Sequence, residues 1–221
     1  MVIINPFGPL MYKERISDEF LKYLQDEVVK DTIEEASDVG TSLAGNIKSQ
    51  YDAKVDPKRF MDYISPHVMQ YIYSCQERYE SIKASSLGVR EEVSTQIEFH
   101  MGEHGPWLNI QRQHEFNPVH SHAGQISSAL MIDIPDEIEE EQKSWKDKSN
   151  MPCPGQLDFI NDTGGYQWPG SFKVIPKTGD LYLFPASLKH CVYPFYSDVK
   201  RITMSFNVFD IKYGSAMEPD D

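Results

Sequence analysis

Two histidines separated by one residue, with a third histidine much further along the chain, constrain this sequence more than any other feature. His120 and His122 flank a serine, and His190 lies in a later segment of strand-like sequence. Side chains on a β-strand alternate between two faces, so His120 and His122 would point to the same face and could chelate a metal ion. A third imidazole from another strand would leave coordination positions open for water or a substrate. The pattern therefore predicts a metal site for chemistry on a β-scaffold.

The same histidines have two plainer interpretations. The first pair could lie in a solvated loop, and His190, which precedes Cys191, could be a hydrogen-bonded core residue. The neighbouring segments favour the metal site. Residues 179–185 read Gly-Asp-Leu-Tyr-Leu-Phe-Pro before His190, and residues 201–207 read Arg-Ile-Thr-Met-Ser-Phe-Asn after it. Both have the pattern of short strands bounded by turn residues, which places His190 within a sheet.

Together these segments resemble the Fe(II)- and 2-oxoglutarate-dependent oxygenases, in particular the prolyl-4-hydroxylase-like branch with many uncharacterised bacterial and cyanophage members. The pattern of that family is His-x-Asp, then a distal His, then Arg-x-Ser on a following strand. The resemblance covers Trp107 to Val208. The counterparts in this sequence occur in the same order and are His120, His122, His190, Arg201 and Thr203.

The resemblance implies an α+β fold whose core is a double-stranded β-helix, a jelly-roll or cupin-like barrel, buttressed by N-terminal helices. It also implies Fe(II) as the metal, 2-oxoglutarate as a small-molecule cosubstrate and O2 as the oxidant. In such a reaction 2-oxoglutarate is decarboxylated to succinate while a carbon of the prime substrate is hydroxylated. The prime substrate itself is open between a prolyl or other residue of a peptide or protein and a free amino acid.

The resemblance also implies roles for single residues. The three histidines would be the catalytic metal ligands. Arg201 would clamp the distal carboxylate of 2-oxoglutarate through charge-assisted hydrogen bonds, with Thr203 as a hydroxyl partner. Asn109 and Gln111, on the strand that starts at Trp107, would add hydrogen bonds to the cosubstrate.

The chain departs from the family pattern at His122, where the family has a carboxylate. A histidine there raises the net positive charge of the metal site by one unit. Asp133 is a nearby carboxylate that could replace it as a ligand, although its spacing does not match the family. Three imidazoles also suit copper, nickel or zinc. A cupin-like metal protein, a zinc hydrolase and a non-catalytic barrel therefore remain alternatives, although a cupin would need a Glu after the histidine pair and a hydrolase leaves Arg201 unexplained.

The chain of 221 residues predicts a single domain, 1–221. Helical periodicity predicts a mainly helical buttress over residues 1–90, and alternating apolar residues predict the barrel core over 91–212. An acidic segment rich in Pro and Gly forms an insertion at 136–171, where we expect substrate selection. The small and polar residues of 34–54 predict a connecting loop over the mouth of the site.

The formal net charge of −13 argues against a duplex nucleic-acid binder and is compatible with a basic peptide substrate. We expect no membrane association, because no apolar run is long enough to span a bilayer and the first residues do not resemble a signal peptide. Three cysteines form neither a disulfide framework nor a zinc motif, which favours a reducing compartment. We expect a cytoplasmic protein, in the host cytoplasm if it is phage-encoded, with its oligomeric state open and a homodimer included.

Overall fold

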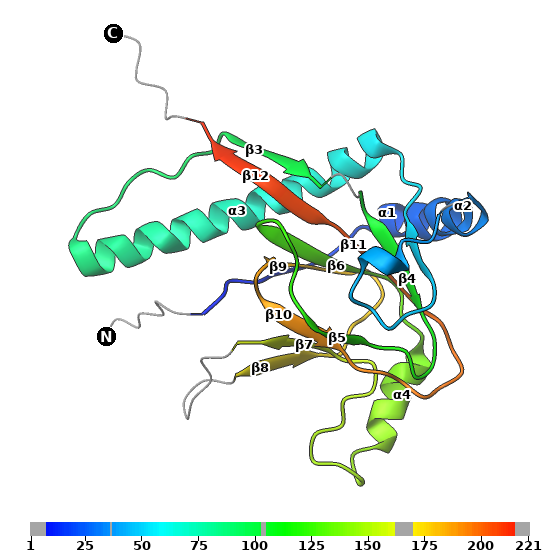
Figure 1. The fold of residues 1–221 in the computed structure, drawn as a ribbon. Helices are drawn as coiled ribbons and strands as arrows, with labels where there is room; N and C mark the ends of the chain where they lie inside the picture. Colours follow the sequence, from blue (N-terminus) through cyan, green and yellow to red (C-terminus); the bar gives the residue numbers. More distant parts are fainter. Residues whose placement is uncertain (1–7, 36, 103–104, 162–169, 215–221) are drawn as a thin grey trace.

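The structure, a computed structural model, describes residues 8–35, 37–102, 105–161 and 170–214. It has a mixed architecture of helices and antiparallel sheets, as Figure 1 shows. The helices are α1 (Asp18–Tyr23), which continues through a π-helical turn (Leu24–Val28) into α2 (Val29–Glu35), a 3-10 turn (Gly40–Ser42), α3 (Pro57–Leu87) and α4 (Asp136–Ser144). The strands are β1 (Tyr12–Arg15), β2 (Gln50–Asp52), β3 (Ile97–Met101), β4 (Trp107–Gln111), β5 (Asn117–His120), β6 (Ile126–Asp133), β7 (Leu157–Ile160), β8 (Ser171–Val174), β9 (Asp180–Pro185), β10 (Lys189–Val192), β11 (Arg201–Ser205) and β12 (Asn207–Tyr213).

These strands form two sheets. The larger has eight strands in the order β1-β9-β6-β11-β4-β2, with β12 pairing β6 and β3. The smaller has four strands in the order β5-β10-β7-β8. In Figure 1 the larger sheet lies between α3 on one side and the smaller sheet on the other. A narrow cleft lies between the two sheets, with residues of β4, β6 and β11 on one side and of β5, β7 and β10 on the other.

Side-chain alternation along the strands of the larger sheet builds two separate cores. On β9, Leu181 and Leu183 pack with the helices, whereas Tyr182 and Phe184 point between the sheets. This follows from the period of two of a β-strand. The helix-facing core consists mainly of apolar side chains, and its largest fully buried residues include Phe60, Phe206, Leu24, Ile64, Leu108 and Leu130. The opposite face can therefore carry polar chemistry without weakening this core.

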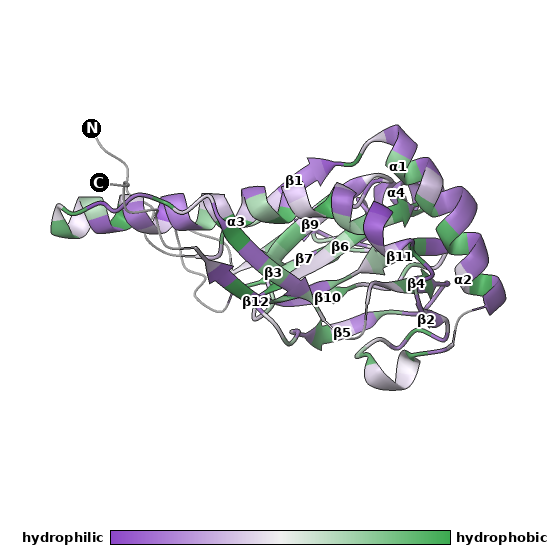
Figure 2. Ribbon diagram, turned by 90° about the horizontal axis from the view of Figure 1, so that it is seen from above, coloured by the Kyte–Doolittle hydropathy of each residue, from purple (hydrophilic) through white to green (hydrophobic). Residues whose placement is uncertain are grey.

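The helices follow local signals in the sequence. Ser17 caps α1, because its Oγ accepts a hydrogen bond from the backbone N–H of Phe20 at 3.2 Å. Asp56 caps α3 in the same way, and Pro57 occupies the first helical position. α3 runs for 31 residues to Gly88, which has a φ of 70°. Figure 2 shows that its C-terminal part extends beyond the sheets.

The structure differs from the sequence-based expectations in three places. The helices before residue 90 are few; β1 precedes them and β2 lies between α2 and α3. β2 lies in the segment predicted to be a loop and pairs with β4 at the edge of the larger sheet. The acidic run at the start of the predicted insertion forms α4, whose first turn carries three acidic residues that favour a helix N-terminus. Residues 162–169 of that insertion lie outside the described residues. None of the helices in the described ranges combines the length and apolar character of a membrane span.

Candidate metal centre

The structure brings the three predicted histidines together between the two sheets. β5 and β10 are antiparallel neighbours, and His120 lies directly opposite His190, with their ring centroids 4.3 Å apart. His122 lies just beyond the end of β5 rather than on a strand. Its backbone N–H donates to the carbonyl of Ala186 at 2.9 Å, which holds it beside β10. One ring nitrogen from each histidine lies within 4.8 Å of the other two.

Backbone carbonyls fix which nitrogen of two rings is free. The Nδ1 atom of His120 lies 2.7 Å from the carbonyl of Pro118, and Nδ1 of His190 lies 2.9 Å from that of Leu188. A carbonyl only accepts, so each Nδ1 carries the proton and each Nε2 keeps a lone pair for a metal.

The distance between two of these nitrogens fits a shared ion. Nε2 of His122 lies 3.2 Å from Nε2 of His190. Two nitrogens bound to one ion by bonds of about 2.1 Å at right angles lie about 3.0 Å apart. This pair of nitrogens is therefore spaced as two ligands of one transition-metal ion would be.

Burial keeps these imidazoles neutral. It lowers the pKa of His122 to about 3, with a smaller contribution from the neighbouring charges on His190 and His120. It lowers the pKa of His190 to about 4, and it also lowers the pKa of His120. Neutral imidazole is the form that binds metals, so the three ligands need lose no proton near pH 7.

Aromatic rings surround the histidines. The ring centroid of Trp107 lies 5.8 Å from that of His122, and Phe184 lies 4.8 Å from His190. No carboxylate joins the cluster within the described residues. Asp133, the alternative ligand, is exposed at the end of β6, where burial and then the charge of Glu137 raise its pKa. The structure does not place Asp133 with the histidines, because the end of β6 lies away from the site.

Arg201 lies in the same interior space. It is almost fully buried on β11 and lines a narrow cleft of about 40 Å³, here called the inner cleft, together with the three histidines, Trp107, Asn109 and Thr203. One guanidinium nitrogen, Nη1, donates to the carbonyl of Gly155 at 2.8 Å, and Nη2 lies 3.6 Å from the sulfur of Met131.

Nothing among the described residues neutralises this guanidinium. It forms no ion pair with a described carboxylate, and its buried Nε has no hydrogen-bond partner. Burial lowers the pKa of Arg201 to about 10, so the side chain still carries its charge at neutral pH. A buried charge without a counter-charge is costly, which makes the inner cleft suited to a carboxylate ligand.

The other predicted cosubstrate residues divide into two groups. Thr203 and Asn109 are cross-strand neighbours and both line the inner cleft. The side-chain oxygen of Asn109 already accepts from Gln50 at 2.8 Å. Gln111 lies opposite Arg201 in register but does not line the cleft, and its amide donates to the carbonyl of Glu115 at 2.6 Å. The structure therefore brings Asn109 to the site and leaves Gln111 outside it.

Sequence reasoning missed the residues that contact Arg201. Gly155 and Met131 carry no sequence signal for this role, because only the folded chain brings a turn and β6 against β11. Gly155 has a φ of 64°, a conformation that favours glycine. The turn is also tied to α4, since Gln142 donates to the carbonyl of Pro154 at 2.6 Å.

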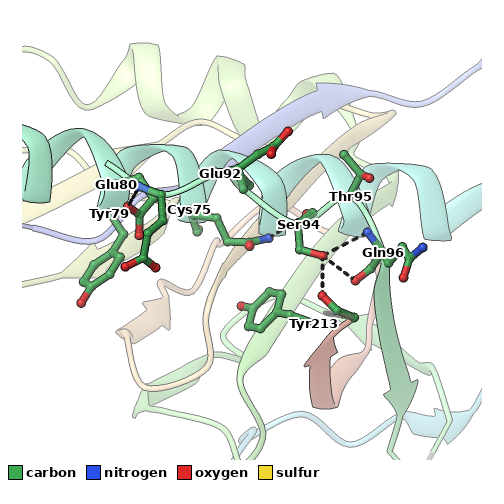
Figure 3. A pocket seen from close by; sticks show the side chains of 12 residues that line it. Cys75, Tyr79, Glu80, Glu92, Ser94, Thr95, Gln96 and Tyr213 are labelled. Atoms are coloured by element: carbon green, nitrogen blue, oxygen red, sulfur yellow. Dashed lines mark hydrogen bonds between the residues drawn. The ribbon is translucent and has the colours of Figure 1, made fainter. Parts of the chain in front are cut away.

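A wider cavity, here called the outer cavity, opens beside His120 and His122. Its volume is about 590 Å³, and its walls include residues of the 37–44 segment, β2, β4 and β12. A larger cavity of about 740 Å³ lies elsewhere, between the protruding part of α3 and residues 91–96. Figure 3 shows this second place with Cys75, Tyr79 and Tyr213 around it. It shares no lining residue with the histidine cluster.

Comparisons with known proteins agree with this chemistry. Residues 105–207 match the sequence model of a family described as "Putative 2OG-Fe(II) oxygenase". This range contains all three histidines and Arg201, and it is slightly less than half of the chain. No curated protein matches the chain in sequence.

Several solved structures align with most of the chain at low identity. A prolyl-4-hydroxylase from Pseudomonas putida aligns over 89% of this chain and 90% of its own, at 14% identity and a TM-score of 0.48. A prolyl hydroxylase from Trichoplax adhaerens, solved with a peptide fragment of hypoxia inducible factor, aligns over 92% and 84%, at 12% identity and a TM-score of 0.49. HygX from Streptomyces hygroscopicus, with nickel, 2-oxoglutarate and hygromycin B bound, aligns over 91% and 82%, at 10% identity and a TM-score of 0.48.

The family match confirms the resemblance that the sequence motifs indicated. Fe(II) and 2-oxoglutarate are the cofactor and cosubstrate for which that superfamily is named, and the histidine cluster fits the iron. The match over residues 105–207 supports the assignment of this region to the 2OG-Fe(II) oxygenase superfamily.

Proposed function

We propose that the protein is an Fe(II)- and 2-oxoglutarate-dependent dioxygenase that hydroxylates its prime substrate. His120, His122 and His190 would hold the iron, and Arg201 would hold the distal carboxylate of 2-oxoglutarate. The observation that carries this proposal is the coexistence, in one cleft, of three neutral imidazoles and a buried guanidinium without a described carboxylate. A cation site beside an anion site is what a metal and a dicarboxylate together require.

The proposal includes the architecture around the site. The two antiparallel sheets would be the two halves of a double-stranded β-helix, within a single domain that includes the N-terminal helices. The metal ligands come from β5, the residue pair after it, and β10 of the smaller sheet. Arg201 and Thr203 come from β11 of the larger sheet. The site would therefore form only when both sheets are assembled.

Once bound, iron with 2-oxoglutarate and O2 supplies an oxidant strong enough to hydroxylate a C–H bond, with 2-oxoglutarate converted to succinate and CO2. The protein contributes position and enclosure. Arg201 fixes the far end of 2-oxoglutarate by two charge-assisted hydrogen bonds, and the hydroxyl of Thr203 adds a third contact. The rings of Trp107, Phe159 and Phe184 exclude water around the histidines.

His122 sets this site apart from the usual pattern of two histidines and a carboxylate. Because a neutral histidine stands where the usual pattern has a carboxylate, the metal together with its ligands would carry one more positive charge. That charge strengthens the attraction for the anionic cosubstrate and weakens the attraction for the metal cation, by Coulomb's law. We infer that binding of 2-oxoglutarate and of iron reinforce one another in this protein.

Succinate formation tests the proposal. The purified protein with Fe(II), ascorbate and O2 should convert 2-oxoglutarate to succinate slowly even without a prime substrate, and the product can be measured by mass spectrometry. Arg201→Met should lose this conversion at subsaturating 2-oxoglutarate. Arg15→Met is the matched control, because Arg15 is an exposed residue outside the inner cleft. Equal succinate formation by Arg201→Met and the wild type would contradict the assignment of Arg201.

A further inference from the structure

The outer cavity has the position and size of a substrate site. It is lined by His120 and His122 at the metal centre and is open to solvent on its other side. A volume of about 590 Å³ lies in the range of small-molecule sites. Serines, apolar residues and aromatic rings make up most of its walls. The predicted insertion, where we expected substrate selection, supplies no lining residue among those that the structure describes.

Among the described residues that line this cavity, one is a carboxylate. Asp52, the last residue of β2, lies directly opposite Trp107 of β4. Cross-strand neighbours in an antiparallel pair project from the same face of the sheet. The pair two residues along, Gln50 and Asn109, lies on the same face of the sheet, and its side chains are hydrogen-bonded to each other. Asp52 therefore lies on the same face of the sheet as Trp107, whose ring approaches that of His122.

Among the described residues, no positively charged side chain pairs with this carboxylate. None of the lining residues is Lys or Arg, and Asp52 forms no ion pair with the described residues. The backbone N–H of Asp52 donates to the carbonyl of Ser37 at 3.4 Å, which ties the strand to the 37–44 segment. The carboxylate itself remains available to a ligand.

Two aromatic residues form walls of the same cavity. Trp107 is one, and Phe209 of β12 is the other. Gly102 and Gly124 pack closely against the ring of Phe209. A Cβ atom added to Gly102 would lie 2.6 Å from that ring, and one added to Gly124 would lie 3.2 Å from it. Gly124 also has a φ of 94°. A carboxylate next to aromatic faces is a favourable environment for an organic cation.

We propose that the prime substrate carries a cationic group, an amine or a guanidinium, that binds between Asp52 and Trp107. Its carbon to be oxidised would then lie toward His120 and His122. This inference rests on the proposed function and adds the chemical class of its substrate. A net charge of −13 would also draw a cationic substrate toward the protein.

The arrangement would separate two ligands by charge. Arg201 lies in the inner cleft and suits the carboxylate of 2-oxoglutarate, whereas Asp52 lies in the outer cavity and repels it. Repulsion from Asp52 would keep 2-oxoglutarate out of the outer cavity, and repulsion from Arg201 would keep a cationic substrate out of the inner cleft. An anionic prime substrate would meet repulsion from Asp52.

Binding without turnover tests this proposal. The probes are the Nα-acetyl amides of L-lysine and L-arginine, with the norleucine amide as the neutral analogue of lysine and the glutamate amide as the anionic one. Dissociation constants are measured by ligand-observed NMR with the Zn(II)-loaded protein and 2-oxoglutarate. The variants are Asp52→Asn, Asp52→Glu and Asp26→Asn, the last removing the same charge from an exposed helical residue outside the cavity.

We expect a cationic probe to bind the wild type at least about fivefold more tightly than norleucine amide, the factor that one partly exposed ion pair provides. Asp52→Asn should abolish this preference, while Asp52→Glu and Asp26→Asn should retain it. The proposal is overturned if norleucine or glutamate amide binds as tightly as the cations, if no cation binds, or if Asp52→Asn keeps the preference. Circular dichroism verifies that each variant is folded. Because no turnover is required, this result is independent of succinate formation, which tests the dioxygenase itself.

Discussion

The Nε2 atoms of His122 and His190 lie 3.2 Å apart although the residues are separated by 68 positions in the chain. The antiparallel register of β5 and β10 creates this proximity, because it sets His120 opposite His190 and leaves His122 at the end of the pair. A slip of one residue in that register would turn His190 away from the site. The proximity of the three histidines is thus a direct product of strand pairing.

Exchange of His122 for aspartate restores the ligand pattern of the wider superfamily. Asp carries a negative charge, so we expect His122→Asp to bind Fe(II) or Co(II) at least as tightly as the wild type does. For the same reason we expect this variant to bind the anionic 2-oxoglutarate more weakly than the wild type does. Anaerobic titration with Co(II), followed by its visible absorption, measures the first effect. His122→Ala is the control and should bind the metal more weakly than either. If His122→Asp loses the metal as fully as His122→Ala, residue 122 does not lie at a ligand position.

Removal of the buried charge at Arg201 should leave the stability of the protein nearly unchanged but weaken its binding of 2-oxoglutarate. Replacement of an unpaired buried ion by an apolar residue of similar length is often neutral or stabilising, so Arg201→Met should unfold in urea with a free energy within about 1 kcal/mol of the wild type or above it. Its affinity for 2-oxoglutarate should fall about 100-fold, since the charge-assisted clamp is gone. A strong loss of stability with unchanged affinity would instead show that Arg201 is a structural residue.

The histidine cluster should make the metal-free protein sensitive to acid. Burial holds the pKa of His122 at about 3 and of His190 at about 4 in the folded state. These values lie below about 6.5, the value for an unfolded chain. The unfolded chain therefore takes up more protons as the pH falls through about 6.5 toward 4, so the free energy of unfolding must decrease across that window.

Urea unfolding of the metal-free protein between about pH 7 and about pH 4.5 measures this decrease. His190→Gln removes one of the two groups, so its stability should fall less steeply with acid. His100→Gln, at an exposed position on β3, should keep the wild-type slope. Identical slopes for His190→Gln and the wild type would contradict the buried, neutral state of His190.

A methyl group at Gly155 should disturb the turn that contacts Arg201. Gly155 has a φ of 64°, and a Cβ atom there would overlap Cγ2 of Ile138 on α4. We expect Gly155→Ala to lose about 1–3 kcal/mol of unfolding free energy. Part of this loss should be recovered in combination with Ile138→Ala, so the two losses would not add. Strict additivity in the urea measurements would indicate that the conflict with Ile138 is absent.

Several parts of this structure could be predicted from the sequence because they depend on local patterns. Alternating apolar residues predicted a β-rich region from residue 91 onward, and β3 to β12 lie in that part of the chain. The spacing of His120 and His122 indicated that they would act together. Their role as metal ligands stays a prediction from residue type, and the structure brings the three histidines close enough to share one ion.

The remaining features depend on contacts between distant segments. Asp52 lies within a polar stretch predicted to be a loop, and only the pairing of β2 with β4 places it beside Trp107. Gln111 has the residue type of a cosubstrate ligand, yet a carbonyl at Glu115 takes its amide. The position of Asp52 depends on which strand becomes its neighbour, whereas Gln111 is engaged by a residue four positions away through a bend that residue alternation does not reveal.

Anaerobic titration of the metal-free protein with Fe(II) and then 2-oxoglutarate tests the central claim most directly. Chelation of the iron by 2-oxoglutarate gives a visible metal-to-ligand charge-transfer band. We expect this band in the wild type, a much weaker band in Arg201→Met at the same 2-oxoglutarate concentration, and none in His190→Ala. Binding of iron without a band in the wild type would contradict the cosubstrate site, and failure to bind iron at all would contradict the metal centre.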